Sequence, residues 1–193
     1  TDIPELITFI LGAMWIRDNR YKNLYFLIPI AALNRETAIA LVLLYFLTWI
    51  GREKNAVLFR RTFVYGLLWL IPSGILAYIF GFRTVGDTWH FWENVRGLLS
   101  VFSRPNIYNQ FYFLLYLCGF YWILAFRNFR NKDLFLQRSV IMVIAFFLFA
   151  FIKVARISEV RMFMPFYVFI IPLGLFSLFE KNARQKKDKA RSI

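Results

Sequence analysis

Apolar residues along this chain fall into seven runs, which are separated by short polar and charged segments. Five of the runs hold 14 to 18 residues each with almost no charge, close to the roughly 17–25 apolar residues that a helix needs to cross a bilayer. The pattern predicts an all-α fold, a polytopic transmembrane helical bundle with about five spans. The runs cover residues 3–16, 24–33, 39–50, 63–80, 111–126, 139–155 and 162–179.

Composition supports a membrane protein and changes how the charge is interpreted. Hydrophobic residues make up 60% of the chain, more than a soluble domain normally carries; a soluble bundle of buried core helices is the alternative. The net charge of +13 would suit nucleic acid. The basic residues, however, flank the apolar runs, as residues that set membrane topology do. We therefore expect membrane lipid, and not nucleic acid, as a partner.

The positions of the basic residues predict the path of the chain. In total, 17 of the 24 basic residues lie in four segments, 17–23, 51–62, 127–138 and 180–193. The positive-inside rule puts all four in the cytoplasm, yet a single span over residues 24–50 would separate the first two. The stretch must then enter the membrane and return as a re-entrant helical hairpin. Its tip is Asn-Arg-Glu-Thr, residues 34–37, and its arms are too short for full spans.

This topology brings three polar features to the outer side of the membrane. They are the hairpin tip, the loop 81–110 and the turn 156–161. Residues 1–179 are predicted to form a single integral membrane domain, followed by a basic cytoplasmic tail at 180–193. The chain begins with Thr1 and not with methionine, which raises the alternative that the domain lacks N-terminal spans.

The hairpin tip is the first candidate binding site. A charge at the bilayer centre costs roughly 2.5–3.5 kcal/mol on insertion scales, so Arg35 and Glu36 should face the bundle interior or a cavity. Asn34 can cap the helix that begins near Glu36. The three residues predict an anion or substrate site. The alternative is a helix cap with an ion pair that only ties helices together.

A second charged group consists of Arg156, Glu159 and Arg161. These residues are the predicted partners of the tip, and two arginines around one glutamate leave positive charge in excess. The planar guanidinium matches phosphate oxygens in a bidentate geometry. Together with Arg35, the group predicts a site for a lipid-linked phosphate or pyrophosphate. The alternative is an interfacial ring of arginines that reach the lipid headgroups.

The loop 81–110 contributes further candidates. It carries the only histidine, His90, close to Asp87 and Trp89. One histidine with carboxylates is a weak metal signal, so we expect no metal and no cofactor. The Trp89 ring offers a face on which a sugar can stack. Residues 91–102 predict an amphipathic helix that lies in the membrane interface.

Two motifs carry a family resemblance. "LNRETA" at 33–38 opens a hydrophobic helix, and "ARISEVRMFMPFYVFIIPLG" at 155–174 forms most of the last run. Both resemble uncharacterised bacterial polytopic proteins that are similar to the C-terminal part of glycosyltransferases of the GT-C class. The resemblance implies a location in the bacterial inner membrane and a polyprenyl-phosphate-linked sugar donor at the outer face. It assigns Arg35, Arg156, Glu159 and Arg161 to the donor pocket.

The resemblance also implies an inverting transfer, in which a carboxylate deprotonates the acceptor while cations stabilise the leaving phosphate. Glu36 and Asp87 are the candidate catalytic carboxylates. GT-C enzymes usually carry this group in the first outer loop, which has no counterpart here. A non-catalytic membrane subunit or lipid-binding scaffold, with a membrane-protein partner, is the alternative function. A transporter half is the second alternative, although no inverted repeat accompanies the hairpin.

Overall fold

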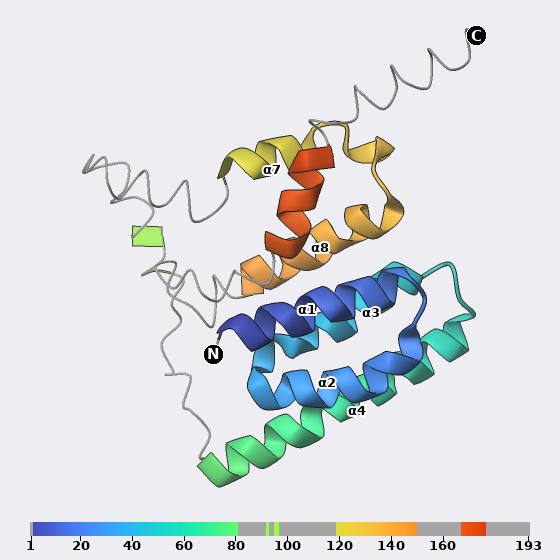
Figure 1. Ribbon diagram of the computed structural model, residues 1–193, viewed down its shortest axis with the longest axis vertical. Coiled ribbons are helices and arrows are strands. Elements are labelled where there is room, and N and C mark those ends of the chain that lie inside the picture. Colours follow the sequence, from blue (N-terminus) through green and yellow to red (C-terminus); the bar gives the residue numbers. More distant parts are fainter. Residues whose placement is uncertain (1, 81–91, 93–94, 97–118, 150–166, 177–193) are drawn as a thin grey trace, which may run out of the picture.

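The computed structural model describes residues 2–80, 92, 95–96, 119–149 and 167–176 (Figure 1). Within these ranges every regular element is a helix, which confirms the all-α class. The longer helices are α1 (Asp2–Arg17), α2 (Leu24–Asn34), α3 (Ile39–Trp49), α4 (Asn55–Phe80), α7 (Gly119–Phe126), α8 (Leu134–Phe149) and Tyr167–Phe176. Short 3-10 helices are η1 (Tyr21–Asn23), η2 (Glu36–Ala38) and η3 (Phe129–Asn131).

Helices α1, α2 and α3 form the centre of the bundle (Figure 1). Helix α4 packs against α2 and α3, and α8 packs against α3 from another side. The core between them is apolar, with Phe9, Ile28 and Leu41 almost fully buried. Gly12 allows α1 and α3 to approach, because a Cβ at this position would lie 2.7 Å from a methyl carbon of Leu41.

The predicted helical hairpin is present. Its arms, α2 and α3, have 11 residues each and are therefore roughly 16 Å long, about half the thickness of a bilayer core. Arg35 is extended, at φ −161° and ψ 144°, and this single non-helical residue followed by η2 reverses the chain. The tip lies beside the N-terminal half of α1, where Glu5 contacts Arg35 and Thr37.

The three basic segments within the described residues lie at one end of the bundle (Figure 1). The end of α1, the turn before α4 and the turn before α8 all lie at this end. Two hydrogen bonds join this end: Arg138 Nη1 donates to the Thr48 carbonyl at 2.6 Å, and Tyr65 Oη donates to the Tyr21 carbonyl at 2.8 Å. Segments 17–23, 51–62 and 127–138 thus lie at one end of the described helices, and their location on the cytoplasmic side of a membrane stays a prediction.

A buried lysine fixes the helices that follow α4. Lys132 is 4% exposed, and its Nζ donates to the carbonyl oxygens of Leu124, Ala125 and Leu173 at 3.0, 2.5 and 2.9 Å. These oxygens belong to the C-terminal turns of α7 and of Tyr167–Phe176. A cation there satisfies carbonyls that lack an intrahelical partner and complements the helix dipoles.

Among the described helices, only α4 is long and apolar enough to cross a membrane. It has 26 residues, and only 6% of its most apolar stretch is buried by the rest of the chain. The other apolar helices are shorter, and the predicted count of about five spans is not established by them. The predicted interfacial helix 91–102 lies outside the described residues apart from Trp92, Val95 and Arg96.

Candidate site at the hairpin tip

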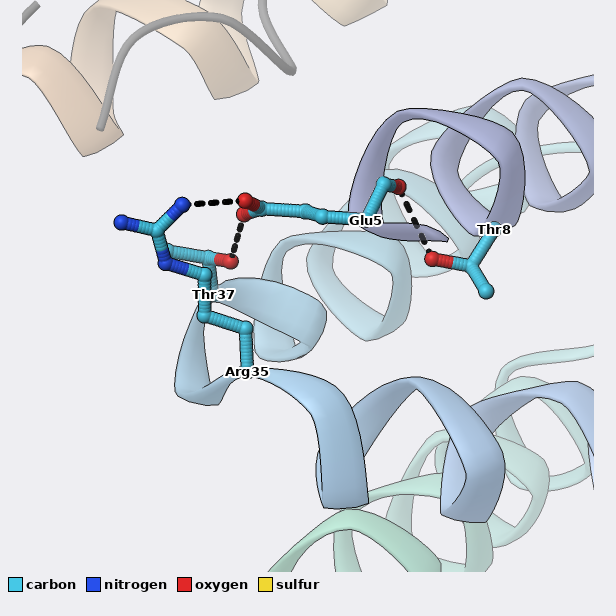
Figure 2. A network of polar contacts seen from close by, with 4 residues as sticks. All are labelled: Glu5, Thr8, Arg35 and Thr37. Carbon is cyan, nitrogen blue, oxygen red and sulfur yellow. Dashed lines mark hydrogen bonds and ion pairs between the residues drawn. The ribbon is translucent and has the colours of Figure 1, made fainter. Parts of the chain in front are cut away.

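A carboxylate from α1 and two residues of the hairpin tip form a polar network inside the apolar bundle (Figure 2). Glu5 Oε2 pairs with Arg35 Nη1, and Glu5 Oε1 accepts a hydrogen bond from Thr37 Oγ1. The Glu5 side chain is 3% exposed and the Arg35 side chain 29%. Because a buried charge needs a partner, this network allows both charges to lie within the bundle.

Local backbone geometry positions the two hairpin residues. The Arg35 amide still donates to the Ala31 carbonyl at 2.9 Å, so α2 ends at this residue. The extended backbone of Arg35 then turns its side chain toward α1, while the Arg35 carbonyl accepts from the amide of Ala38 at 3.2 Å and starts η2. Thr37 follows in η2 with its hydroxyl on the same carboxylate (Figure 2).

Asn34 does not take the predicted capping role. Asn34 is the last residue of α2 and does not cap the next helix, since the residue before η2 is Arg35 and no side chain caps η2. Glu36 is exposed, and the described partner of Arg35 is Glu5. The sequence contained a signal for this pairing, because Glu5 is the single charge within the apolar run 3–16.

The tip is also attached to α4. Trp69 Nε1 donates to the Glu36 carbonyl at 3.0 Å. Trp69 lies in the middle of α4, and about three further helical turns of α4 continue beyond it. The tip therefore lies near the middle of the longest apolar helix and not at its end.

No family model, no curated protein and no solved structure matches this chain.

The site is thus defined by its own residues. Asn34, Arg35 and Glu36 come together at the tip. The other predicted site residues, Asp87, Trp89, His90, Arg156, Glu159 and Arg161, lie outside the described ranges. Within those ranges no group of three His, Cys, Asp or Glu side chains is arranged to hold a metal ion.

A second polar cluster, at the basic end, was not predicted. Glu53 pairs with Arg61 and accepts a hydrogen bond from the Tyr45 hydroxyl at 3.1 Å. The guanidinium carbon of Arg61 lies 3.9 Å from the centre of the Tyr21 ring, a cation–π distance. Tyr65 packs edge-on against Tyr45, with ring centroids 5.0 Å apart. Three helices (η1, α3 and α4) and the turn before α4 contribute to this cluster, which no local pattern in the sequence had indicated.

Proposed function

We propose that this chain is a multi-span membrane protein whose hairpin tip helps to bind a polyprenyl-phosphate-linked sugar, as in a GT-C-like glycosyltransferase. The surface of the described helices supports the membrane part. Large apolar side chains are exposed along all of α4, including Phe63 at 67%, Ile71 at 56% and Phe80 at 80%. Soluble monomers rarely expose contiguous apolar surface of this extent. Hydrocarbon covers such side chains at no cost.

If α4 crosses the membrane, positions along it indicate the depth of the residues that contact it. At about 1.5 Å per residue, Trp69 stands roughly 21 Å from Asn55 and roughly 16 Å from Phe80. Since Trp69 contacts the tip, Asn34, Arg35 and Glu36 lie near the middle of a bilayer core about 30 Å thick. Polar backbone and charged side chains persist at that depth only when protein, water or a polar ligand surrounds them.

The hydrogen bond of Trp69 to the Glu36 carbonyl, half-way along α4, is the observation that carries the proposed site. Asn34 and Glu36 are exposed and Arg35 partly so, and lipid chains cannot solvate them. A water-filled pocket that opens away from the basic end would solvate them and would admit a lipid-linked substrate sideways from the bilayer. In the proposed reaction, the Glu36 carboxylate takes the acceptor proton as the acceptor oxygen bonds to the anomeric carbon. The bond from that carbon to the phosphate oxygen breaks, and Arg35 stabilises the leaving phosphate.

The remaining assignments belong to the same proposal. Arg156, Glu159 and Arg161 would complete the phosphate site, and Asp87, Trp89 and His90 would contact the sugar or the acceptor. The membrane would be the bacterial inner membrane, with about five spans, the tip facing outward and the tail 180–193 in the cytoplasm. The resemblance of the "LNRETA" and "ARISEVRMFMPFYVFIIPLG" stretches supports these assignments.

Binding of a polyprenyl phosphate, compared with the matched polyprenol, tests the proposal. The full chain in detergent should bind the phosphate at least about tenfold more tightly than the alcohol, because charge-assisted hydrogen bonds recognise phosphate. Arg35→Lys keeps the charge but removes the fork, and it should reduce this preference. Arg20→Lys, an exposed position at the basic end, is the matched control. Equal affinity for both lipids would contradict the phosphate site.

Catalysis requires a separate test. Glu36→Gln should stop the release of polyprenyl phosphate from a lipid-linked sugar while leaving the binding of the phosphate intact. Asp18→Asn is the control, because it removes one negative charge from an exposed position just after α1, at the basic end. It should change neither the release nor the binding of polyprenyl phosphate. Release that is unaffected by Glu36→Gln would remove this carboxylate from the mechanism.

A non-catalytic membrane subunit is the second candidate, and one observation favours it. Both carboxylate oxygens of Glu5 are engaged within the network, one by Arg35 and one by Thr37. A network whose groups satisfy one another can tie α1 to the hairpin without any bound substrate. This candidate predicts that Arg35 variants lower stability and that no preference for the polyprenyl phosphate exists in any variant.

A further inference from the structure

Two arginines, Arg52 and Arg138, lie near the junction of α3 and α8, at the basic end of the bundle and far from the hairpin tip. Helix α3 ends at Trp49, and Gly51, with φ +75°, turns the chain so that Arg52 follows on the outside. From the other side, Arg138 in the second turn of α8 donates to the Thr48 carbonyl at 2.6 Å. Arg52 is exposed and Arg138 is half-buried.

The charges at this junction are not balanced by acids. Among the described residues, no carboxylate forms an ion pair with Arg52 or Arg138. The glutamate–arginine pairs in the described part of the chain are Glu5–Arg35, at the tip, and Glu53–Arg61. Burial and the nearby positive charge of Arg52 lower the pKa of Arg138, which precedes the apolar run 139–155. Capping the carbonyls of α3 accounts for Arg138 alone. It gives no reason for a second arginine close by.

An apolar stripe runs away from the two arginines along α8. Leu134, Arg138, Ile141 and Leu148 share one helical face, since they are spaced by four, three and seven residues. Ile141 is 54% exposed and Leu148 53%. Ile50, beside Arg52, is exposed as well, at 42%. A positive site at the head of an exposed apolar stripe matches an anionic amphiphile better than it matches a soluble anion.

We propose that Arg52 and Arg138 hold the phosphate of an anionic phospholipid whose acyl chain lies along the Ile141–Leu148 stripe of α8. The phosphate would bridge the two guanidinium groups and relieve their repulsion. The lipid would belong to the leaflet at the basic end, which in the predicted topology is the cytoplasmic leaflet. This inference rests on the membrane location proposed above but not on sugar transfer, which concerns the opposite end of the hairpin.

Thermal stabilisation of the full chain in a neutral detergent tests the inference. Phosphatidylglycerol, phosphatidylcholine and inorganic phosphate are the three probes, and the midpoint of unfolding is the readout. We expect phosphatidylglycerol to raise the midpoint by several degrees, and the other two probes to raise it by less than half as much. Equal stabilisation by inorganic phosphate would overturn the proposal in favour of a soluble anion. Equal stabilisation by phosphatidylcholine would overturn it in favour of unspecific lipid contact.

Two charge-matched variants localise the effect. Arg52→Gln removes an exposed side chain with no described partner, so the fold should persist, and the shift due to phosphatidylglycerol should fall at least twofold. Arg60→Gln removes the same charge from the same end but on α4, and should retain the shift. Equal losses in both variants would assign the effect to net charge and would contradict a site at the α3–α8 junction. The transfer and polyprenyl-phosphate assays should not change in either variant.

Discussion

The bundle contains a glutamate–arginine ion pair at each end of the hairpin, and the two pairs differ in depth. Glu5 and Arg35 lie at the tip, with the carboxylate 3% exposed. Glu53 and Arg61 lie at the basic end, where both side chains remain about one-fifth exposed, at 20% and 19%. Water can solvate the remaining charge of the second pair if either Glu53 or Arg61 is removed. It cannot solvate Glu5, so the same chemistry should contribute very different stability at the two ends.

The difference also separates the functions that each end can perform. At the basic end, exposed arginines and lysines lie beside the ends of the apolar helices. Their positive charge suits anionic lipid headgroups. The tip presents few charges, and each of them carries a high desolvation cost. Such charges persist where the bundle interior or a cavity surrounds them, which is why the tip and not the basic end is the candidate substrate site.

Removal of the tip carboxylate should have the largest effect. Glu5→Ala removes the buried carboxylate that pairs with the part-buried Arg35 and accepts from Thr37, and it should lower the free energy of unfolding by about 3 kcal/mol, the lower end of the range for a broken buried pair. The measurement is denaturant unfolding in detergent. The double variant Glu5→Ala, Arg35→Ala should be less destabilised than the sum of the two single variants. Additive effects would show that the two side chains do not act as a pair.

The stability lost on removing a charged side chain should depend on its burial and not on the end of the bundle at which it lies. Lys132 tests this expectation, because it is buried at the basic end. Lys132→Met keeps the length of the side chain but leaves the carbonyls of Leu124, Ala125 and Leu173 without their cation. We expect a loss of roughly 1.5–3 kcal/mol, the range for hydrogen bonds to charged groups. Lys54→Met, at an exposed position of the same end, is the control and should change stability by less than about 0.5 kcal/mol.

The approach of α1 to α3 holds Glu5 over the tip, and Gly12 tests that approach. Gly12→Leu adds a side chain where a Cβ alone would already lie 2.7 Å from Leu41, so we expect a loss of about 1–3 kcal/mol from overpacking. Gly66→Leu is the matched control on α4, because nothing lies within 4 Å of a Cβ at that position. Thermal midpoints of the two variants give the comparison, and similar losses would argue against close packing at Gly12.

The smallest effect should come from the partly exposed pair. Glu53→Gln removes its ion pair with Arg61 but keeps a hydrogen-bond acceptor for Tyr45, and it should cost about 1 kcal/mol or less. Part of that loss should disappear in high salt, because exposed charges are screened. Unfolding with and without 1 M salt, where the Debye length is about 3 Å, measures this. If Glu53→Gln lowered the free energy of unfolding as much as Glu5→Ala, burial would not explain the difference between the two ion pairs.

Local patterns in the sequence predicted much of the fold but not the partners at the tip. The basic segments 17–23 and 51–62 predicted a hairpin over residues 24–50, because charge asymmetry constrains topology over short loops. The hairpin was found with arms of almost the predicted length. The pairing of Arg35 with Glu5 was missed, since it joins residues 30 positions apart and depends on how α1 packs. No periodicity within one helix reports such a contact.

The cap predicted at Asn34 failed for a related reason. Asparagine before a helix is a common cap, but α2 continues through Asn34, and the chain reverses at Arg35 instead. Arg35 adopts the extended conformation that brings its guanidinium to Glu5. The residue at which α2 ends is thus the one that makes the tertiary ion pair with Glu5, and local propensity did not identify it.

The central claim is that the hairpin tip reaches mid-membrane depth and opens away from the basic end. Single cysteines at Asn34 and Asn55, in a Cys118→Ala background, test it directly with a membrane-impermeant thiol reagent applied to intact cells. The account predicts that the cysteine at Asn34 reacts from the outside, and that the cysteine at Asn55 reacts only after the membrane is permeabilised. Reaction of both from the same side, or at Asn34 only after permeabilisation, would contradict the account.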